Sequence, residues 1–285
     1  MRSNDEIIRL QAQHHECVNT EGFETPEEYL LYLMHLRAYE EAVAEFVDET
    51  KVILDLGCNT GYGSAFLAAS AREVVGADVS ESALAEARDR YGSVQNLSFV
   101  QTDGKTVPFE SGTFDGSTSM QVIEHVGDYE PYLSEIRRLL RPEGVAVFST
   151  PNARLRLDDP LRPWNRFHVR EFDAADLQAL LRRYFSEVDI RGLHAVEELD
   201  ALERQRVSRA RLAAREAPRT AFSRLVSRGR PLRRLLTWWD RGGSRATPDP
   251  STHELASVQR YSTKDLWYTT EQVDEALDLL AVCRV

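Results

Sequence analysis

Residues 52–64, VILDLGCNTGYGS, contain the feature that decides the fold. An apolar run that is typical of a buried strand meets Asp55 and then gives way to three glycines with small polar residues among them. Glycines in such a loop allow positive φ angles and a close approach of the backbone to a ligand. Many α/β folds have a loop of this kind, so by itself it predicts a ligand site and leaves the ligand open, with a dinucleotide among the candidates.

Strands and helices alternate on both sides of this loop. The apolar periodicity predicts helices over residues 26–47, 64–71, 81–91, 129–140 and 173–185. Strands are expected over residues 51–57, 73–80, 96–104, 115–126, 144–152 and 186–194, with a last strand at the C-terminus. Because these strands are mostly apolar and alternate with helices, we expect a parallel sheet covered by helices on both faces.

The bulk composition is that of an ordinary globular protein. The chain has 285 residues, of which 42% are hydrophobic and 28% charged, enough for one large domain with an insertion. No run approaches the roughly 20 apolar residues of a transmembrane helix, and the N-terminal MRSNDEIIRLQAQHHE lacks the apolar core of a secretory signal. The three cysteines are far apart in sequence, so we expect a reducing cytoplasm and no zinc site.

An arginine-rich segment interrupts a chain whose net charge is −11. Residues 201–245 carry 13 arginines, no lysine and three acids, within an insertion at about 197–255 before the last strand. Three interpretations stay open: a solvated helical cap, an interfacial helix that makes the protein peripheral to the inner membrane, and RNA binding. Phe222, Trp238 and Trp239 among the arginines are typical of a lipid surface, and the lack of a recognisable RNA module disfavours nucleic acid.

Polar residues stand at the ends of the next three expected strands. Asp78 ends the second strand, where a carboxylate can accept both ribose hydroxyls of a nucleotide. Asp103 ends the third, where an acid can accept the exocyclic amine of an adenine, and the fourth ends in QVIEH at residues 121–125. Because ligands of such sheets bind at the carboxyl ends of the strands, these residues predict an adenosine-bearing ligand with a substrate beside it.

In order and spacing, residues 50–152 resemble the class I S-adenosylmethionine-dependent methyltransferases. The motifs that carry the resemblance are DLGCNTGYGS, GADVS, TDG with PFESGTFD downstream, QVIEHV and LLRPEGVAVFSTPN. The resemblance implies a Rossmann-like, doubly wound α/β sheet of seven strands with a reversed last strand, and S-adenosylmethionine as the methyl donor. The chain departs from the family pattern at Asn59, where the DxGxGxG loop usually has glycine.

The resemblance also assigns the donor contacts residue by residue. Gly57 and Asn59 would hold the methionine part of the donor, Asp78 the ribose and Asp103 the adenine. Asp55 is expected to brace its loop near the donor's amine. The other implied members of the donor site lie at the same four strand ends and are Gly61, Val79, Gly104 and Gln121.

A narrower resemblance concerns the acceptor. MHLRAYEEA, before the first strand, and NRFHVREF, after the fifth, are similar to a bacterial subgroup that methylates sugars and glycans. This similarity implies an N-terminal helical arm or lid, residues 1–48, that closes with the HVREF loop over the acceptor beside a methyltransferase domain of residues 49–285. The acceptor contacts that it implies are Tyr39, Glu124, Arg166 and Arg170. Ala38 separates Tyr39 from the basic residue, whereas the two are adjacent in the commoner pattern.

A histidine base is the predicted catalytic group. Methyl transfer is an in-line displacement from a sulfonium, so alignment supplies much of the rate. A hydroxyl is a poor nucleophile at neutral pH and gains from a positioned base, for which histidine is suited. We expect His168 to be that base, with His125 second because it could instead brace its loop against Glu124. His14 and His15 lie on a polar arm and are expected to be bystanders.

The QVIEH stretch also resembles the ExxEH metal element of quinone O-methyltransferases. Gln121 replaces the first carboxylate of that element. Hard divalent cations favour anionic oxygen ligands, so no metal ion is expected here, and magnesium is the alternative.

The sequence therefore predicts an S-adenosylmethionine-dependent O-methyltransferase that acts on a hydroxyl of a sugar, glycan or sugar-containing natural product. Two alternatives remain: a methyltransferase of quinones or other small molecules, and a cofactor-binding partner subunit without turnover. Polar residues at all four strand ends argue against the second. The expected partner is a small-molecule or glycan acceptor, with peripheral membrane or lipid-linked contact through residues 201–245 and no nucleic acid.

Overall fold

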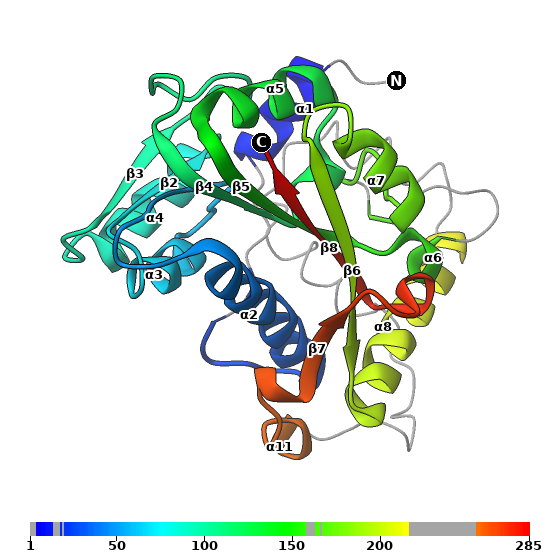
Figure 1. The fold of residues 1–285 in the computed structure, drawn as a ribbon. Helices are drawn as coiled ribbons and strands as arrows, with labels where there is room; N and C mark the ends of the chain where they lie inside the picture. Colours follow the sequence, from blue (N-terminus) through cyan, green and yellow to red (C-terminus); the bar gives the residue numbers. More distant parts are fainter. Residues whose placement is uncertain (1–3, 14–17, 19, 158–162, 166, 217–254) are drawn as a thin grey trace.

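An eight-stranded mixed sheet forms the centre of the structure (Figure 1). The structure is a computed structural model that describes residues 4–13, 18, 20–157, 163–165, 167–216 and 255–285. Across the sheet the strands lie in the order β3-β2-β1-β4-β5-β8-β6-β7. In chain order they are β1 (Val52–Leu56), β2 (Glu73–Asp78), β3 (Leu97–Gln101), β4 (Phe114–Met120), β5 (Leu140–Pro151), β6 (Glu187–Ala195), β7 (Leu266–Thr269) and β8 (Asp278–Arg284).

The expected count of seven strands is wrong by one. Strands β1 to β5 pair in parallel, and the C-terminal β8 is antiparallel to both of its neighbours, β5 and β6. The additional strand is β7, which pairs antiparallel with Gly192–Ala195 at the far end of β6. Its sequence, LWYT, is only four residues long but rich in aromatic and β-branched side chains, which suit an edge strand.

Helices cover both faces of the sheet (Figure 1). Residues of α2 and α3 pack with Ile53 on one face, and residues of α5 and α7 pack with Leu54 on the other, because successive side chains of a strand point to opposite faces. The helices are α1 (Asn4–Gln13), α2 (Pro26–Phe46), α3 (Tyr62–Ala68), α4 (Glu81–Tyr91), α5 (Tyr129–Leu139), α6 (Ala153–Arg156), α7 (Ala174–Leu181), α8 (Glu197–Glu216) and α11 (Leu255–Val258), with short 3₁₀ turns η1 (Ile123–His125), η2 (Thr263–Asp265) and η3 (Val273–Glu275).

The helix starts follow local sequence signals. Thr25 caps α2 by accepting the N–H of Glu28, and Pro26 occupies the first turn, as the sequence predicts. Ser80 caps α4 in the same way through the N–H of Ala83. The Ser80 cap fixes where α4 begins after β2, and so it sets the position of the loop at that strand end.

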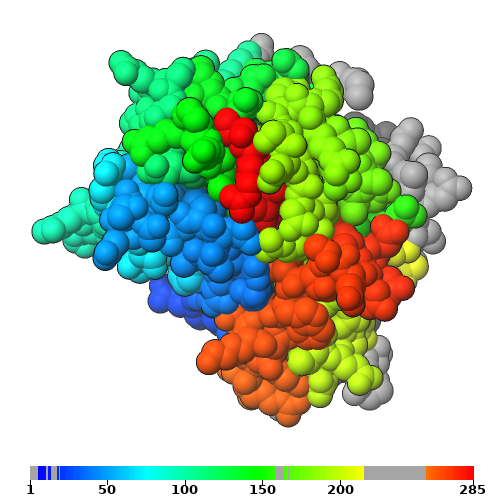
Figure 2. Space-filling model, viewed as in Figure 1, coloured from blue at the N-terminus to red at the C-terminus, as the bar shows by residue number. Residues whose placement is uncertain are grey.

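A third apolar cluster joins the beginning of the predicted insertion to the N-terminal arm. Leu30 and Leu33 of α2 pack with Leu199 and Leu202 of α8 and with Leu266 of β7. Figure 2 shows the segment after residue 255, in orange, lying against α2 in blue and the yellow-green residues of β6 and α8. The described parts of the arm and of the insertion therefore belong to one packed body with the sheet.

Most of the arginine-rich segment lies outside the described residues. Of the predicted insertion at about 197–255, residues 197–216 form α8, whereas residues 217–254, with Phe222, Trp238 and Trp239, are not described. Among the helices that the structure describes, none is both long enough and apolar enough to span a bilayer.

Candidate functional site

The parallel strands end at a cavity of about 180 Å³. Its wall comes from α1, from the segments that follow β1, β2, β3 and β4, from α5, and from the loop that holds Phe167. The predicted site residues that line the cavity are Gly57, Asn59, Asp78, Val79, Gly104, Gln121 and His125. Open α/β sheets bind their ligands in such a crevice at the carboxyl ends of the strands.

The loop after β1 meets the cavity with its backbone. Gly57 has a φ of 82°, and a Cβ there would lie 2.4 Å from Cγ2 of Val122. A residue with a side chain does not fit at this position without moving Val122, so the glycine allows the loop to pass close to a ligand.

Gly61 lies outside the cavity wall. A Cβ at Gly61 would come within 2.7 Å of the Phe99 ring and 2.9 Å of Cβ of Ala87. This glycine therefore lets the start of α3 pack against β3 and α4, and the donor contact expected of Gly61 is not what the structure shows.

Asp78 joins two loops at the cavity wall. Its Oδ2 accepts the N–H of Asn59 at 2.9 Å, and its Oδ1 accepts the N–H of Ser80 at 2.8 Å. The carboxylate thus holds the loops after β1 and β2 together, with Val79 beside it in the wall. A carboxylate oxygen can accept more than one hydrogen bond, so these two bonds do not prevent Asp78 from accepting ligand hydroxyls as well.

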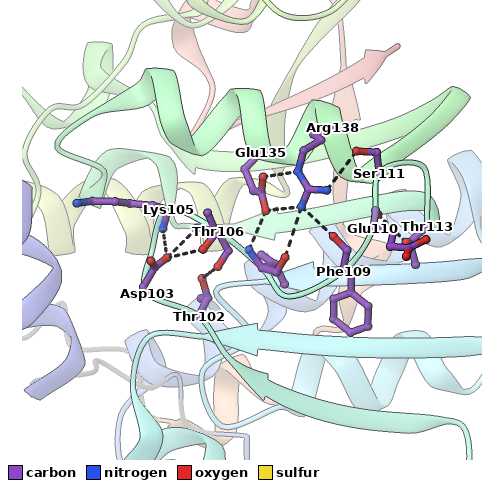
Figure 3. A network of polar contacts seen from close by, with 11 residues as sticks. Thr102, Asp103, Lys105, Thr106, Phe109, Glu110, Ser111, Thr113, Glu135 and Arg138 are labelled. Atoms are coloured by element: carbon purple, nitrogen blue, oxygen red, sulfur yellow. Dashed lines mark hydrogen bonds and ion pairs between the residues drawn. The ribbon is translucent and has the colours of Figure 1, made fainter.

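The side chain of Asp103 forms hydrogen bonds within the turn that follows β3 (Figure 3). Its Oδ1 accepts the N–H groups of Lys105 at 2.8 Å and Thr106 at 2.7 Å. Hydrogen bonds from the Thr106 backbone hold the pKa of this carboxyl below its usual range, despite slight burial. Asp103 does not line the cavity, whereas its neighbour Gly104 does, so the expected adenine contact of Asp103 is not formed by the side chain as it stands.

An ion pair between a buried carboxylate and a partly exposed arginine braces the same segment from α5 (Figure 3). Glu135 accepts the N–H of Val107 at 2.8 Å and pairs with Arg138 at 2.7 Å, and Arg138 in turn donates to the carbonyl of Phe109 at 3.0 Å. These bonds fix the loop between β3 and β4 against α5. Glu135 also lines the cavity, a position that the sequence analysis did not anticipate.

Helix α1 closes the cavity near Gly104. A Cβ at Gly104 would lie 3.1 Å from Cδ1 of Ile8 and 3.3 Å from Cγ1 of Val79. Ile8 belongs to the polar N-terminal arm, and its contact depends on tertiary packing, so no local sequence signal identified it.

Asp55 and Tyr39 lie beneath the cavity. The Asp55 carboxylate is fully buried and accepts from Ser64 at 2.6 Å, Thr118 at 2.8 Å and Tyr39 at 3.2 Å. Burial raises the pKa of Asp55 to about 6, although these hydrogen bonds oppose the shift. Asp55 therefore ties α2, α3 and β4 together beneath the loop that follows β1. Tyr39 is 4% exposed, and the structure gives it this buried bond in place of the predicted acceptor contact.

The end of β4 combines a strained backbone with buried polar side chains. Gln121 has a φ of 56°, and its Nε2 donates to Oγ of Ser149 at 3.3 Å and to Oδ2 of Asp278 at 3.1 Å. A non-glycine residue with positive φ is uncommon and is found at functional sites. Gln121 therefore connects the cavity to the first residue of β8.

Glu124 is buried behind the cavity and holds the HVREF loop. Its Oε2 accepts from Thr150 at 3.0 Å, and burial raises its pKa to about 8. Its backbone carbonyl accepts the N–H groups of Val169 at 2.7 Å and Arg170 at 3.3 Å. The side chain of Glu124 is 1% exposed and so does not reach an acceptor in this structure. Instead, the residue holds the HVREF loop in place through its backbone carbonyl.

Two histidines meet at this docking point. The rings of His125 and His168 lie edge to face with centroids 4.7 Å apart. Nδ1 of His125 lies 3.1 Å from the carbonyl oxygen of Phe167; because a carbonyl only accepts, Nδ1 carries the proton and Nε2 the lone pair. Burial, with the nearby His168, lowers the pKa of His125 to about 3. His125 lines the cavity and His168 does not.

His168 pairs with a carboxylate that the sequence analysis missed. Its Nδ1 lies 2.7 Å from Oε1 of Glu171, which also accepts from Nε of Arg156 at 3.2 Å. Burial lowers the pKa of His168. The H-x-x-E spacing within HVREF could have indicated that Glu171 pairs with His168. Arg156 lies on a separate short helix, and no sequence pattern linked it to this site.

Of the two remaining acceptor residues, one is exposed and one is not described. Arg170 pairs with Asp176 at 2.6 Å, and its guanidinium lies 4.9 Å from the centroid of the Phe172 ring. It does not line the cavity, so it has no place at the site as it stands. Arg166 lies outside the described residues.

Comparison with known proteins gives a consistent picture. A family model described as a methyltransferase domain matches residues 54–148. A probable S-adenosylmethionine-dependent methyltransferase of Mycolicibacterium smegmatis is 38% identical over 141 residues, which are 48% of this chain and 52% of that protein. A fatty-acid O-methyltransferase of the same organism is 30% identical over 202 residues, or 70% of this chain and 69% of that protein. The chain spans about half the length of the first curated relatives that it matches.

Solved structures agree on the fold. A phosphoethanolamine N-methyltransferase of Haemonchus contortus aligns over 100% of this chain and 60% of its own, with a TM-score of 0.58 and 15% identity. The [4+2]-cyclase SpnF aligns over 99% of this chain and 97% of its own, with a TM-score of 0.56 and 17% identity. Since one of these catalyses a cyclisation, the shared fold alone leaves the reaction open.

Proposed function

Because the chain belongs to the S-adenosylmethionine-dependent methyltransferases, we propose that it transfers the donor's methyl group to a hydroxyl of a sugar, glycan or sugar-containing natural product. The supporting observation is that one cavity extends from Asp78 and Gly104 to His125. Donor and acceptor would therefore lie next to each other, with a histidine on the acceptor side.

The donor end is the part of the cavity around Asp78. Gly57 and Asn59 would face the methionine part and Asp78 the ribose, while the backbone at Gly104 is the nearest part of the β3 loop to the adenine. The supporting geometry is the close backbone approach at Gly57 and the fixed carboxylate of Asp78.

The acceptor end is the part around His125. In the reaction the acceptor oxygen forms a bond to the methyl carbon as the bond from that carbon to the sulfonium sulfur breaks, and the hydroxyl proton must leave. Because Nδ1 of His125 donates to the Phe167 carbonyl, Nε2 is the ring atom that can receive that proton; burial lowers the pKa of the ring to about 3, so the proton then passes on readily. We therefore place His125 before His168 as the proton acceptor of the ion-free enzyme, because His168 is 5% exposed and lies behind it.

The surroundings of His125 support a polar acceptor. Gln121, Glu124 and Asp278 lie at the ends of neighbouring strands, and a hydroxyl-rich ligand has the donors and acceptors to match such groups. Of these groups, Gln121 lines the cavity together with His125, so both side chains can face such a ligand.

A second candidate is a lipid-like or quinone acceptor. The observation that favours it is the fatty-acid O-methyltransferase relative, which is 30% identical over 70% of this chain. The lipid-binding helix predicted for residues 201–245 would support it. However, the described arginines of α8 already pair with groups of the protein itself. Arg206 pairs with Glu203 at 2.6 Å, and Arg211 donates to the carbonyl of Leu155 at 3.0 Å.

An acceptor panel tests the proposal. Purified protein is incubated with S-adenosylmethionine and with sugars, glycosylated natural products, quinols or fatty acids, and S-adenosylhomocysteine and methylated product are measured by mass spectrometry. We expect turnover with hydroxylated sugars or glycosides that is strongly reduced in His125→Ala. Turnover confined to fatty acids or quinols would support the second candidate, and donor binding without turnover on any acceptor would contradict both.

A further inference from the structure

We propose that Glu124, His125 and His168 form a binding site for one divalent transition-metal ion, of the class that accepts mixed nitrogen and oxygen ligands, such as Zn²⁺, Mn²⁺ or Co²⁺. One ligand atom from each of the three residues lies within 4.8 Å of the others. The inference goes beyond the methyl transfer proposed above, because ion binding requires neither the methyl donor nor an acceptor.

The separations are close to those of a bound site. Bonds of about 2.1 Å from an ion to nitrogen or oxygen place two ligand atoms about 3.4 Å apart in a tetrahedral site, and at most about 4.2 Å apart when they lie on opposite sides of the ion. Nε2 of His125 already lies 4.0 Å from Oε1 of Glu124. Side-chain adjustments of about 1 Å would bring all three ligand atoms onto one ion.

Each ligand is held from behind by a partner that orients it. Nδ1 of His125 is bonded to the Phe167 carbonyl, Nδ1 of His168 to the Glu171 carboxylate, and Oε2 of Glu124 to the hydroxyl of Thr150. The ligand atoms would then be Oε1 of Glu124 with Nε2 of His125, which lie 4.0 Å apart, and Nε2 of His168. Metal-binding histidines almost always donate their second ring N–H to a carbonyl or carboxylate in this way.

The backbone brings the two halves of the site together. His168 is far from Glu124 in sequence, but the N–H groups of Val169 and Arg170 bond to the Glu124 carbonyl. The loop that carries His168 is therefore fixed on the turn that carries Glu124 and His125. A site assembled on rigid backbone contacts needs little reorganisation when the ion binds.

A buried carboxylate oxygen supplies an independent observation. Glu171 is 4% exposed, and its Oε2 accepts no hydrogen bond from any residue that the structure describes. Its other oxygen contacts both His168 and Arg156. The Glu171 carboxylate therefore lies directly behind the His168 ring, where its negative charge would favour a cation held by that ring.

The ligand set selects the class of ion. The side chain of Gln121 is directed to Ser149 and Asp278 and does not join the cluster, so the site offers two nitrogens and one carboxylate. Such a set suits transition ions better than magnesium, which prefers oxygen. Because His125 lines the cavity, the open coordination positions would face the acceptor, and the imidazoles would then act as ligands in place of the proton-acceptor role of the ion-free enzyme.

Metal binding by the full chain, without any acceptor, tests the inference. Protein stripped with a chelator is dialysed against Zn²⁺ or Co²⁺, and bound metal is measured by elemental analysis, affinity by calorimetry, and ligand geometry by the visible spectrum of Co²⁺. We expect one ion per chain. His168→Ala should weaken binding at least about tenfold, and Glu171→Gln, which removes only the orienting charge, about ten- to a hundredfold.

The controls separate this inference from the proposed function and from loss of folding. His194→Ala removes a histidine on β6 that has no part in the cluster, and it should bind the ion as the wild type does. Binding of S-adenosylhomocysteine, measured on each variant, reports an intact donor end. Absence of ion binding by stripped wild-type protein would overturn the proposal, as would unchanged binding in both His168→Ala and Glu171→Gln with donor binding retained.

Discussion

The two ends of the cavity are built in different ways. At the donor end the loops are held mainly by backbone groups, as when the N–H groups of Asn59 and Ser80 bond to Asp78. At the acceptor end the structure depends on buried ionisable side chains from distant segments, such as His125 with His168 and Glu171. Because of this difference, we expect substitutions at the donor end to change the affinity for the methyl donor, and substitutions at the acceptor end to change the rate of turnover.

The largest effect is expected at the acceptor end. His125→Ala removes the imidazole that lines the cavity, so kcat should fall by about 10²–10⁴-fold, the usual contribution of a positioned base. The dissociation constant for S-adenosylhomocysteine should change by less than about threefold, since the donor loops keep their own bonds. Steady-state kinetics and calorimetry on the same preparations measure both quantities. Equal losses in donor affinity and in kcat would remove the distinction between the two ends.

The second effect concerns the carboxylate beneath the donor end. The folded-state pKa of Asp55 is about 6, above the ordinary 3.8, so the folded protein holds this proton more tightly than the unfolded chain. The stabilisation is therefore present below about pH 4 and is lost as pH rises through 6, by about 3 kcal/mol in total.

Asp55→Asn isolates this contribution because asparagine does not titrate. The free energy of unfolding of the wild type, relative to the variant, should decrease between pH 4 and pH 7 in chemical denaturation. A difference that stays constant or increases with pH would show that Asp55 is not the buried brace that the structure indicates.

A smaller effect is expected from Asp78→Asn. Replacing the carboxylate weakens its charge-assisted hydrogen bonds, worth about 1.5–3 kcal/mol, so S-adenosylhomocysteine should bind about ten- to a hundredfold more weakly. At saturating donor, kcat should stay near the wild-type value. Unchanged affinity in a calorimetric titration would exclude Asp78 from the ribose contact.

The smallest effect is expected from Asp103→Asn, which serves as the matched control for Asp78→Asn. The asparagine oxygen can still accept the N–H groups of Lys105 and Thr106 that Asp103 holds. Donor affinity should therefore fall less than about threefold. A loss of donor affinity of tenfold or more would instead support the adenine contact that the sequence predicts for this residue.

The same contrast explains how far the sequence could predict the molecule. The position of the donor end could be predicted because sequence motifs at successive strand ends define it. Gly57 and Asp78 stand directly at strand ends, and their positions follow from the alternation of strands and helices. Parallel strands, helix caps and the reversed C-terminal strand are local or family-level features of the same kind. The edge strand β7 was missed because four residues give too short a periodic signal.

Side-chain direction was the part that the sequence could not supply. Tyr39 and His168 were expected at the acceptor, but packing buries Tyr39 on Asp55 and places His168 behind His125. Ile8 reaches Gly104, and Arg156 reaches Glu171, only through tertiary folding. Which face a loop residue presents depends on what docks against it, and no spacing within the chain records that.

The most direct measurement combines donor affinity and single-turnover rate in Asp78→Asn and His125→Ala, with one acceptor identified in the panel. A cavity with one donor end and one acceptor end should give opposite profiles: Asp78→Asn loses donor affinity and keeps its rate at saturating donor, whereas His125→Ala keeps donor affinity and loses its rate. The same profile in both variants, or a normal rate in His125→Ala, would contradict a cavity with one donor end and one acceptor end.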